Sequence, residues 1–379
     1  MVFRPHGETE RGPVTAPLLP KIRAMIEADG PIPVSTYFSL CLADPEHGYY
    51  RTRDPLGAKG DFTTAPEISQ LFGELVGICL ISAWQAHGSP VETRLIEGGP
   101  GRGTMMADIL KTIAALAPAM YGGLSVTLME TSPALRARQK ETLAPHAGRL
   151  SWVDQLGDAP EGFTLFVANE LFDALPTRQF VKSGGHFFER VVTLNDDGAL
   201  AFSLSPTRLE PASLPKDWRT APEGAIFEYA PAREALMAEI AARLIRHGGS
   251  ALVIDYGHLE SGFGDTLQAL RDHRFDPPLA HPGEADLTSH VDFAALAAAA
   301  RASGAHIHPP MTQGDFLAAL GLGPRASALG RGKDAKTQGD IVAAARRLAG
   351  GGPDEMGDLF KALAISSGPV QLAPFDGAD

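Results

Sequence analysis

Five short apolar runs, each ending at a polar residue, recur along the chain. They span residues 93–96, 125–129, 151–153, 164–168 and 250–254. The polar residues that follow them are Glu97, Glu130, Asp154, Asn169 and Asp255. Runs of this length between turns are typical of strands buried in a parallel sheet, and the apolar periodicity of residues 105–116 predicts a helix between the first two. The pattern predicts a doubly wound α/β fold with its functional residues at the carboxyl edge of the sheet.

The rest of the pattern divides the chain into regions. Helical periodicity at 18–28, 34–43 and 67–86 predicts an N-terminal helical lid region, residues 1–90, with a loose Pro/Gly-rich arm at 1–17. The α/β core then takes residues 91–176 and 249–379. Residues 177–248 hold three β-rich runs separated by turn residues, followed by a helix at 231–246, which predicts antiparallel hairpins inserted into the core.

The C-terminal third continues the alternation of helices with short strands. A strand is expected near His306, and helices are expected at 291–302, 314–320, 341–349 and 355–362.

Composition and charge limit the function classes. Hydrophobic residues make up 44% of the 379 residues and the formal net charge is −12, which predicts a packed core and argues against a nucleic-acid partner. Cys41 and Cys79 lie in apolar helical patterns, so buried free thiols are expected and a metal site is not. The N-terminus has no secretory signal pattern and no run reaches transmembrane length, so we predict a cytoplasmic location without membrane insertion.

The most informative motif is the turn after the first apolar run, where Glu97 is followed by Gly98, Gly99, Gly101 and Gly103. Glycines allow backbone torsions closed to other residues and let the main chain approach a ligand. A dinucleotide site prefers Gly-x-Gly-x-x-Gly, but Thr104 occupies the place of its third glycine. A carboxylate beside the turn would repel a pyrophosphate and suits a cationic ligand, such as the amino acid end of S-adenosylmethionine. A glycine-rich turn without a ligand is the alternative.

A second acid, Glu130, stands at the tip of the next strand, where this fold class binds ribose hydroxyls. Thr131 follows it, Ser132 is suited to cap a helix, and Pro133 to begin one. A helix-start carboxylate, favoured by the helix dipole, is the alternative interpretation of Glu130.

Two further segments carry candidate chemistry. Residues 169–176 place Asn169, Glu170 and Asp173 after the fourth run, where the carboxylates are suited to hold or deprotonate a guanidinium. A cluster of helix-capping acids is the alternative. His290, in residues 282–292, is a candidate general base, or equally part of a capped helix start.

A long loop with aromatic residues precedes the helix at 67–86, and such loops are often lids. Thr64, Pro66 and Glu67 at its end are also explained by a simple helix start, with a threonine cap and an early proline.

As a set, these segments resemble the MidA-like family of class I S-adenosylmethionine-dependent methyltransferases. The family includes a mitochondrial respiratory complex I assembly factor that acts as a protein arginine methyltransferase. The resemblance rests on residues 44–50 (DPEHGYY), 60–74 (GDFTTAPEISQLFGE), 97–104, 169–176 (NELFDALP), 255–257, 283–292 and 356–364 (MGDLFKALA). Asp358, followed by Leu359, is a small departure in the last of these.

The resemblance implies a seven-stranded Rossmann-like sheet with added helices and hairpins on the substrate side. It implies that the three glycines line the methionine end of the cofactor, with Glu97 near its amino group, Glu130 on the ribose and Asp154 near the adenine. Thr64, Pro66 and Glu67 would close over the cofactor. The implied activity is methyl transfer to an arginine of a protein, with a complex I subunit as a candidate substrate.

Two other function classes remain open from the sequence. One is a cofactor-binding assembly factor with slow or absent catalysis, and the other is a nicotinamide-dependent oxidoreductase. The sequence also leaves open the acceptor group, the number of methyl groups added and whether the chain forms a homodimer.

Overall fold

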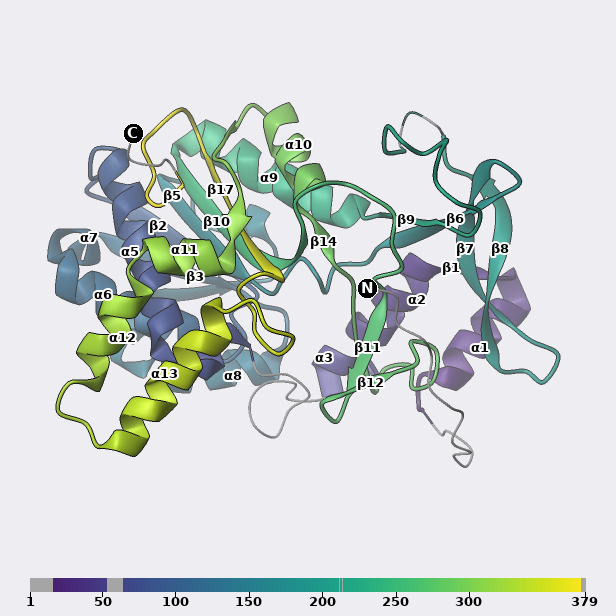
Figure 1. Ribbon diagram of the computed structural model, residues 1–379, viewed down its shortest axis with the longest axis horizontal. Helices are drawn as coiled ribbons and strands as arrows, with labels where there is room; N and C mark the ends of the chain where they lie inside the picture. Colours follow the sequence, from purple (N-terminus) through teal and green to yellow (C-terminus); the bar gives the residue numbers. More distant parts are fainter. Residues whose placement is uncertain (1–15, 53–63, 211, 213, 376–379) are drawn as a thin grey trace.

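The computed structural model describes residues 16–52, 64–210, 212 and 214–375. Its central sheet has five parallel strands in the order β4-β3-β2-β5-β10. They are β4 (Leu150–Val153), β3 (Leu124–Met129), β2 (Thr93–Gly98), β5 (Thr164–Asn169) and β10 (Gly249–His258). The five apolar runs therefore form the parallel strands that the sequence predicts, and their carboxyl ends share one edge (Figure 1).

One predicted helix is absent: residues 355–359 form turns, and residues 360–362 belong to a strand. Residues 355–362 were expected to be helical, but β17 (Phe360–Ser366) runs antiparallel to β10, from Ser250 opposite Ser366 to Tyr256 opposite Phe360. Every residue of β17 is buried, so its sequence lacks the alternation of a half-exposed strand, and periodicity cannot separate it from a helix. The short strands β15 (His306–Ile307) and β16 (Met311–Thr312) pair with β17, and β14 (Val291–Asp292) pairs with β10.

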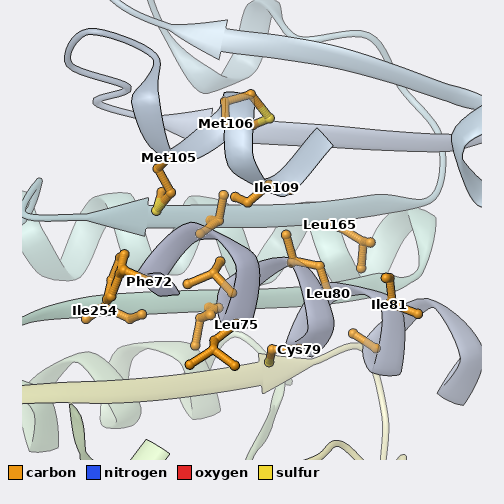
Figure 2. Close-up of a cluster of buried hydrophobic side chains, with 14 of the residues drawn as sticks. Phe72, Leu75, Cys79, Leu80, Ile81, Met105, Met106, Ile109, Leu165 and Ile254 are labelled. Carbon is orange, nitrogen blue, oxygen red and sulfur yellow. The ribbon is translucent and has the colours of Figure 1, made fainter. Parts of the chain in front are cut away.

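Helices cover both faces of this sheet, because alternate strand residues point to opposite sides. On one face, α5 (Gln70–Ala86) and α6 (Thr104–Leu116) pack on Leu165 and Ile254, and Figure 2 shows Phe72 and Met105 in this layer. The elements α11 (Gln313–Ala319), α12 (Leu322–Gly330) and α13 (Ala335–Ala349) extend it. On the other face, α9 (Pro231–His247) and α10 (Phe293–Ala302) pack on Phe166 and Val253.

The predicted hairpins are present as a second sheet. It has the order β1-β7-β6-β9, with β8 beside β7. The strands are β6 (Arg178–Ser183), β7 (His186–Leu194), β8 (Leu200–Arg208), β9 (Ile226–Tyr229) and β1 (Ile32–Pro33). The N-terminal α1 (Leu19–Asp29) and α2 (Val34–Ala43) pack against this sheet, and Ile32 pairs with Val192. The N-terminal region is thus joined to the insertion, as the right-hand part of Figure 1 shows.

A small third sheet lies beside these N-terminal helices. It has the order β12-β11-β13, with β11 (Gln268–Arg271), β12 (Arg274–Asp276) and β13 (Asp286–Thr288). Leu267 and Leu287 share a core with α1 and α2, so this part of the segment 249–379 packs with the N-terminal region. The division of the chain into domains remains a prediction.

Local signals explain two further helix boundaries. Ser132 accepts a hydrogen bond from Leu135 N and begins α8 (Pro133–Thr142), as predicted. The helix expected at 67–86 is divided at Ser69, which separates α4 (Ala65–Ile68) from α5 and caps the latter. The other short helices are α3 (Tyr49–Thr52), α7 (Pro118–Gly122), η1 (Ala144–Arg149) and η2 (Leu156–Asp158).

Both cysteines are buried free thiols, as expected. Within the described ranges, no helix is long and apolar enough to cross a membrane, and no cluster of His, Cys, Asp and Glu is placed to hold a metal ion. Most of the expected N-terminal arm, residues 1–15, and residues 60–63 of the lid motif lie outside the described residues.

Candidate cofactor and substrate site

A cavity of about 560 Å³ opens at the carboxyl edge of the parallel strands. It brings together most of the residues that the sequence predicts for the site. Those that line it are Thr64, Pro66, Glu67, Glu97, Gly99, Gly101, Glu130, Thr131, Asp154, Asn169, Glu170 and Asp173. The structure therefore joins the lid segment, three strand tips and the segment after β5 in one cavity.

The glycine turn forms the floor of this cavity. Gly99, Gly101 and Gly103 all have positive φ, at 65°, 52° and 80°, a conformation that other residues rarely adopt. Gly103 begins α6, and a Cβ on Gly98 would come within 2.8 Å of the Leu171 side chain. Gly98 and Gly103 do not line the cavity, and their role is in the shape of the turn.

Glu97 is the most unusual group in the turn. Its side chain is buried at the tip of β2, and its Oε2 has no hydrogen-bond partner among the described residues. Burial raises the pKa of this carboxyl to about 8. A buried acceptor without a partner is costly, so Glu97 is suited to receive a donor from a ligand.

Glu130 is held by a network that sequence reasoning missed. Its Oε1 accepts from Ser132 N at 2.7 Å, and its Oε2 accepts from Gln139 Nε2 at 3.2 Å. Gln139 also donates to Gly101 O at 2.8 Å, and its Oε1 accepts from Trp152 Nε1 at 2.8 Å. One buried amide thus connects the glycine turn to the next two strands. The only sequence signal is an amide on the inward face of a polar helix.

We expect Gln139→Leu to weaken cofactor binding by about tenfold, because the Gly101 carbonyl and Glu130 would each lose a buried donor. Titration calorimetry with S-adenosylhomocysteine, the demethylated form of the cofactor that the resemblance implies, measures the change. Arg138→Ala, on the exposed side of the same helix, is the matched control and should leave the affinity unchanged. Equal affinities in both variants would show that this network does not support the cofactor site.

The lid residues are tied to both ends of the cavity. Glu67 Oε1 accepts from Thr104 Oγ1 at 2.6 Å, which joins α4 to the start of α6. Ala65 N donates to Glu170 Oε1 at 3.3 Å, which joins α4 to the segment after β5.

At the outer rim of the cavity, Asp154 accepts a hydrogen bond from Arg136 Nη2 at 2.8 Å.

The segment after β5 forms the acidic end of the cavity. Glu170 has a φ of 51°, which is uncommon for a residue with a side chain and marks a tight turn at the strand tip. Asn169 Nδ2 donates to Glu170 Oε1 at 2.9 Å, and Tyr256 Oη donates to Asp173 Oδ2 at 2.9 Å. Asn169 Oδ1 and Asp173 Oδ1 are buried acceptors without a partner in the described part of the chain.

Asp255 holds this turn in place, although the sequence pattern indicated only a strand tip. Its Oδ2 accepts from Phe172 N at 2.9 Å and from Asp173 N at 3.2 Å, and its Oδ1 accepts from Tyr256 N. Asp255 therefore acts on the shape of the turn rather than on a ligand.

The charges at this end are mostly negative. Burial and the neighbouring Asp173 raise the pKa of Glu170 to about 7, and burial raises the pKa of Asp173. The buried cation beside them is Arg233, which donates to the carbonyls of Asp173, Leu175, Ser289 and His290 and to Ser289 Oγ. None of these Arg233 contacts is to a carboxylate oxygen, so the carboxylates at this end keep acceptors that suit a cationic ligand.

The structure does not bring His290 to these carboxylates. Its ring borders a separate cavity of about 790 Å³ and lies edge-on to Tyr256, with ring centroids 5.6 Å apart. Thr266 Oγ1 accepts from its main-chain N–H, and Arg233 binds its carbonyl, so its position is fixed from both sides. Burial, then the charges of His258 and Arg233, lower its pKa to about 4. The placement gives no support to the predicted role of His290 as general base.

Comparison with known proteins gives consistent matches over most of the chain. A family model described as "Putative S-adenosyl-L-methionine-dependent methyltransferase" matches residues 75–311. The mitochondrial protein arginine methyltransferase NDUFAF7 homolog of Drosophila melanogaster is 35% identical over 93% of this chain and 85% of its own. The human protein arginine methyltransferase NDUFAF7, also mitochondrial, is 35% identical over 86% of this chain and 78% of its own.

Solved structures agree with the fold. A Burkholderia thailandensis protein crystallised with S-adenosyl-homocysteine has a TM-score of 0.80 and 30% identity, with 92% of each chain covered. A second structure from the same organism has a TM-score of 0.80 and 32% identity, covering 96% of this chain and 95% of that one. These matches confirm the class I methyltransferase fold. The predicted cytoplasmic location is wrong on this comparison, because the named relatives are mitochondrial proteins.

Proposed function

This chain belongs to the S-adenosyl-L-methionine-dependent methyltransferase family, and from that premise we propose that it methylates an arginine side chain of a protein substrate. The proposal draws on two supports. The fly and human relatives are named protein arginine methyltransferases, and the cavity has an acidic end beside the glycine turn.

The residues present fit the cofactor. Glu97 Oε2, a buried acceptor without a partner among the described residues, matches the cofactor's amino group. Glu130 keeps lone pairs for the ribose hydroxyls, because each of its oxygens accepts one N–H in the structure. A Cβ on Gly99 would lie 3.0 Å from Leu171, so this position of the turn has no room for a side chain. Thr131 and Asp154 would border the adenine.

The main support for an arginine acceptor is the set of buried polar atoms at the acidic end of the cavity. Asn169 Oδ1 and Asp173 Oδ1 are buried acceptors without partners in the described ranges, and Glu170 lies between them in sequence. A guanidinium offers several N–H donors in one plane together with a positive charge, so it would satisfy such a set.

The protein's part in the reaction is to position the acceptor and remove a proton. When bound, the cofactor supplies a methyl group that its sulfonium makes electrophilic. Asn169 Oδ1 and Glu170 would accept hydrogen bonds from the attacking nitrogen and direct its lone pair. A guanidinium is barely nucleophilic because its pKa exceeds 12, so a proton must leave as the new C–N bond forms. Glu170, with a pKa of about 7, is suited to accept it.

Glu170→Gln tests this assignment. We expect kcat to fall by about ten- to hundredfold, which corresponds to about 1.4–2.7 kcal/mol, while the affinity for S-adenosylhomocysteine stays the same. The measurement is transfer of labelled methyl from S-adenosylmethionine to proteins in an extract that lacks this enzyme, with a respiratory complex I subunit as the first purified substrate. Glu141→Gln, on the exposed surface of α8, is the matched control.

Three outcomes of these measurements test the proposed activity and the role of Glu170. Label in a protein band, located on arginine by mass spectrometry and reduced in Glu170→Gln, supports the proposal. Intact turnover in Glu170→Gln with unchanged cofactor affinity would contradict the role of Glu170. Tight binding of S-adenosylhomocysteine without transfer to any protein would favour a non-catalytic assembly factor.

A further inference from the structure

Asp173 has an asymmetric environment at the acidic end of the cavity. Its Oδ2 accepts the phenol proton of Tyr256 at 2.9 Å, whereas its Oδ1 has no partner among the described residues. The side chain is buried, and it lines the same cavity as Glu170. One oxygen is thus fixed by the protein, and the other is a buried acceptor without a protein partner in the described ranges, on a residue that lines the cavity.

Tyr256 is itself held on several sides. It lies at the end of β10, where its ring meets Phe360 edge-on with centroids 5.4 Å apart and His290 with centroids 5.6 Å apart. Its main-chain N–H is bound by Asp255. A phenol that is packed in this way presents its proton in one direction, so it restricts the rotation of the Asp173 carboxylate.

The main chain of Asp173 is equally fixed. Asp255 accepts from its N–H, and Arg233 donates to its carbonyl at 3.0 Å. Both contacts come from other elements, β10 and α9, so the position of the side chain does not depend on the local turn alone. The charge of Arg233 acts against the burial that raises the pKa of Asp173, but in these contacts the guanidinium donates to carbonyls and a hydroxyl and not to the carboxylate.

We propose that Asp173 selects a positively charged acceptor through its Oδ1, and that Tyr256 is the positioning residue that aims this oxygen into the cavity. The proposal rests on the proposed function and extends it, because it assigns the charge requirement to one carboxylate. Glu170 and Asn169 then act on the nitrogen that is methylated, while Asp173 binds another N–H of the same guanidinium. A neutral side chain of the same shape should be rejected.

The test compares binding of two short glycine-flanked peptides in the presence of S-adenosylhomocysteine. One carries arginine and the other carries citrulline, which replaces the guanidinium with a neutral urea. We expect the wild-type protein to bind the arginine peptide at least about tenfold more tightly, the difference between a charged and a neutral hydrogen-bonded pair. Asp173→Asn should abolish most of this preference, and Tyr256→Phe should reduce it by about half on a logarithmic scale.

A double-mutant cycle separates positioning from general support of the fold. If Tyr256 acts through Asp173, then Tyr256→Phe should change the preference little when Asp173→Asn is already present. Equal effects in both backgrounds would contradict the positioning role. Affinity for S-adenosylhomocysteine should stay unchanged in every variant, which confirms an intact cofactor site.

The outcomes also separate this proposal from the proposed function. Equal binding of the two peptides by the wild-type protein, or no binding of either, overturns the charge selection without any variant being needed. A strong arginine preference without methyl transfer would support the selection and contradict the enzymatic proposal. Methyl transfer to arginine, with no preference for binding the arginine peptide over the citrulline peptide, would contradict the selection and support the enzymatic proposal.

Discussion

S-Adenosylhomocysteine, which shares the amino acid end of the methyl donor, should bind about tenfold more tightly for each unit that the pH rises towards 8. The reason is the pKa of Glu97, which burial raises to about 8. The carboxylate form is needed opposite a positively charged amino group. Below pH 8, binding must therefore release the proton that Glu97 holds. Titration calorimetry in two buffers with different ionisation enthalpies measures both the affinity and the proton release.

Glu97→Gln isolates this effect. The amide keeps the shape and one acceptor but has no charge, so at pH 8 we expect a loss of affinity of about a hundredfold or more, in line with about 3 kcal/mol or more for breaking a buried ion pair. The loss should shrink at lower pH, where wild-type Glu97 is also neutral. The same pH slope in the variant and in the wild type would show that another group, such as Glu170, is responsible.

The same pKa affects stability with a definite sign. An acid whose pKa is higher in the folded protein than in the unfolded chain favours the folded state only while it is protonated. The contribution of Glu97 to the free energy of unfolding should therefore be fully present below its unfolded pKa of about 4.5 and be lost progressively as the pH rises from there to about 8. Ligand binding should reverse this loss, so the thermal shift given by S-adenosylhomocysteine should grow with pH.

The strand tips could be predicted because they depend on local sequence. Glu97 and Glu130 each follow an apolar run, and in a parallel sheet the ends of such runs must meet at one edge. No long-range information is needed to place them together. The glycines between them carry their own conformational signal, and their positive φ values agree with it.

The supporting residues could not be predicted because they are defined by contacts across the chain. Gln139 appears in sequence as one polar residue in a polar helix, yet it connects the glycine turn with Glu130. Tyr256 and Asp173 are 83 positions apart, and only the pairing of β10 with β5 brings them into contact. Hydrogen-bond networks of this kind leave no periodic pattern.

The strand β17 shows how local signals mislead, and His290 shows what they leave open. His290 stands in a polar segment near the helix α10, but its main chain is fixed so that the ring faces the other cavity. The residues of β17 lack alternation because the strand is buried on both faces, between β10 and the short strands β15 and β16. In both cases the surroundings, rather than the local sequence, decide the structure.

Arg233→Met should lower the free energy of unfolding by about 3–5 kcal/mol, the range for removing one partner from a buried charged network. Arg233 is 3% exposed and lies between the cofactor cavity and the cavity that His290 borders. Its guanidinium joins the carbonyls of Asp173 and Leu175, after β5, to those of Ser289 and His290, before β14. Methionine fills similar volume but would leave these carbonyls without donors.

Chemical denaturation followed by circular dichroism measures the change. Arg246→Met, on the exposed side of the same helix, is the control, and its free energy of unfolding should stay within about 0.5 kcal/mol of the wild type.

Arg233→Lys separates the effect of the charge from that of the hydrogen-bond geometry. Lysine keeps the positive charge beside Asp173 but cannot span carbonyls on two segments with a planar fork. If the lysine variant is as stable as the wild type, the charge alone is sufficient. If it is nearly as unstable as the methionine variant, the hydrogen bonds across the two segments hold this wall of the site together.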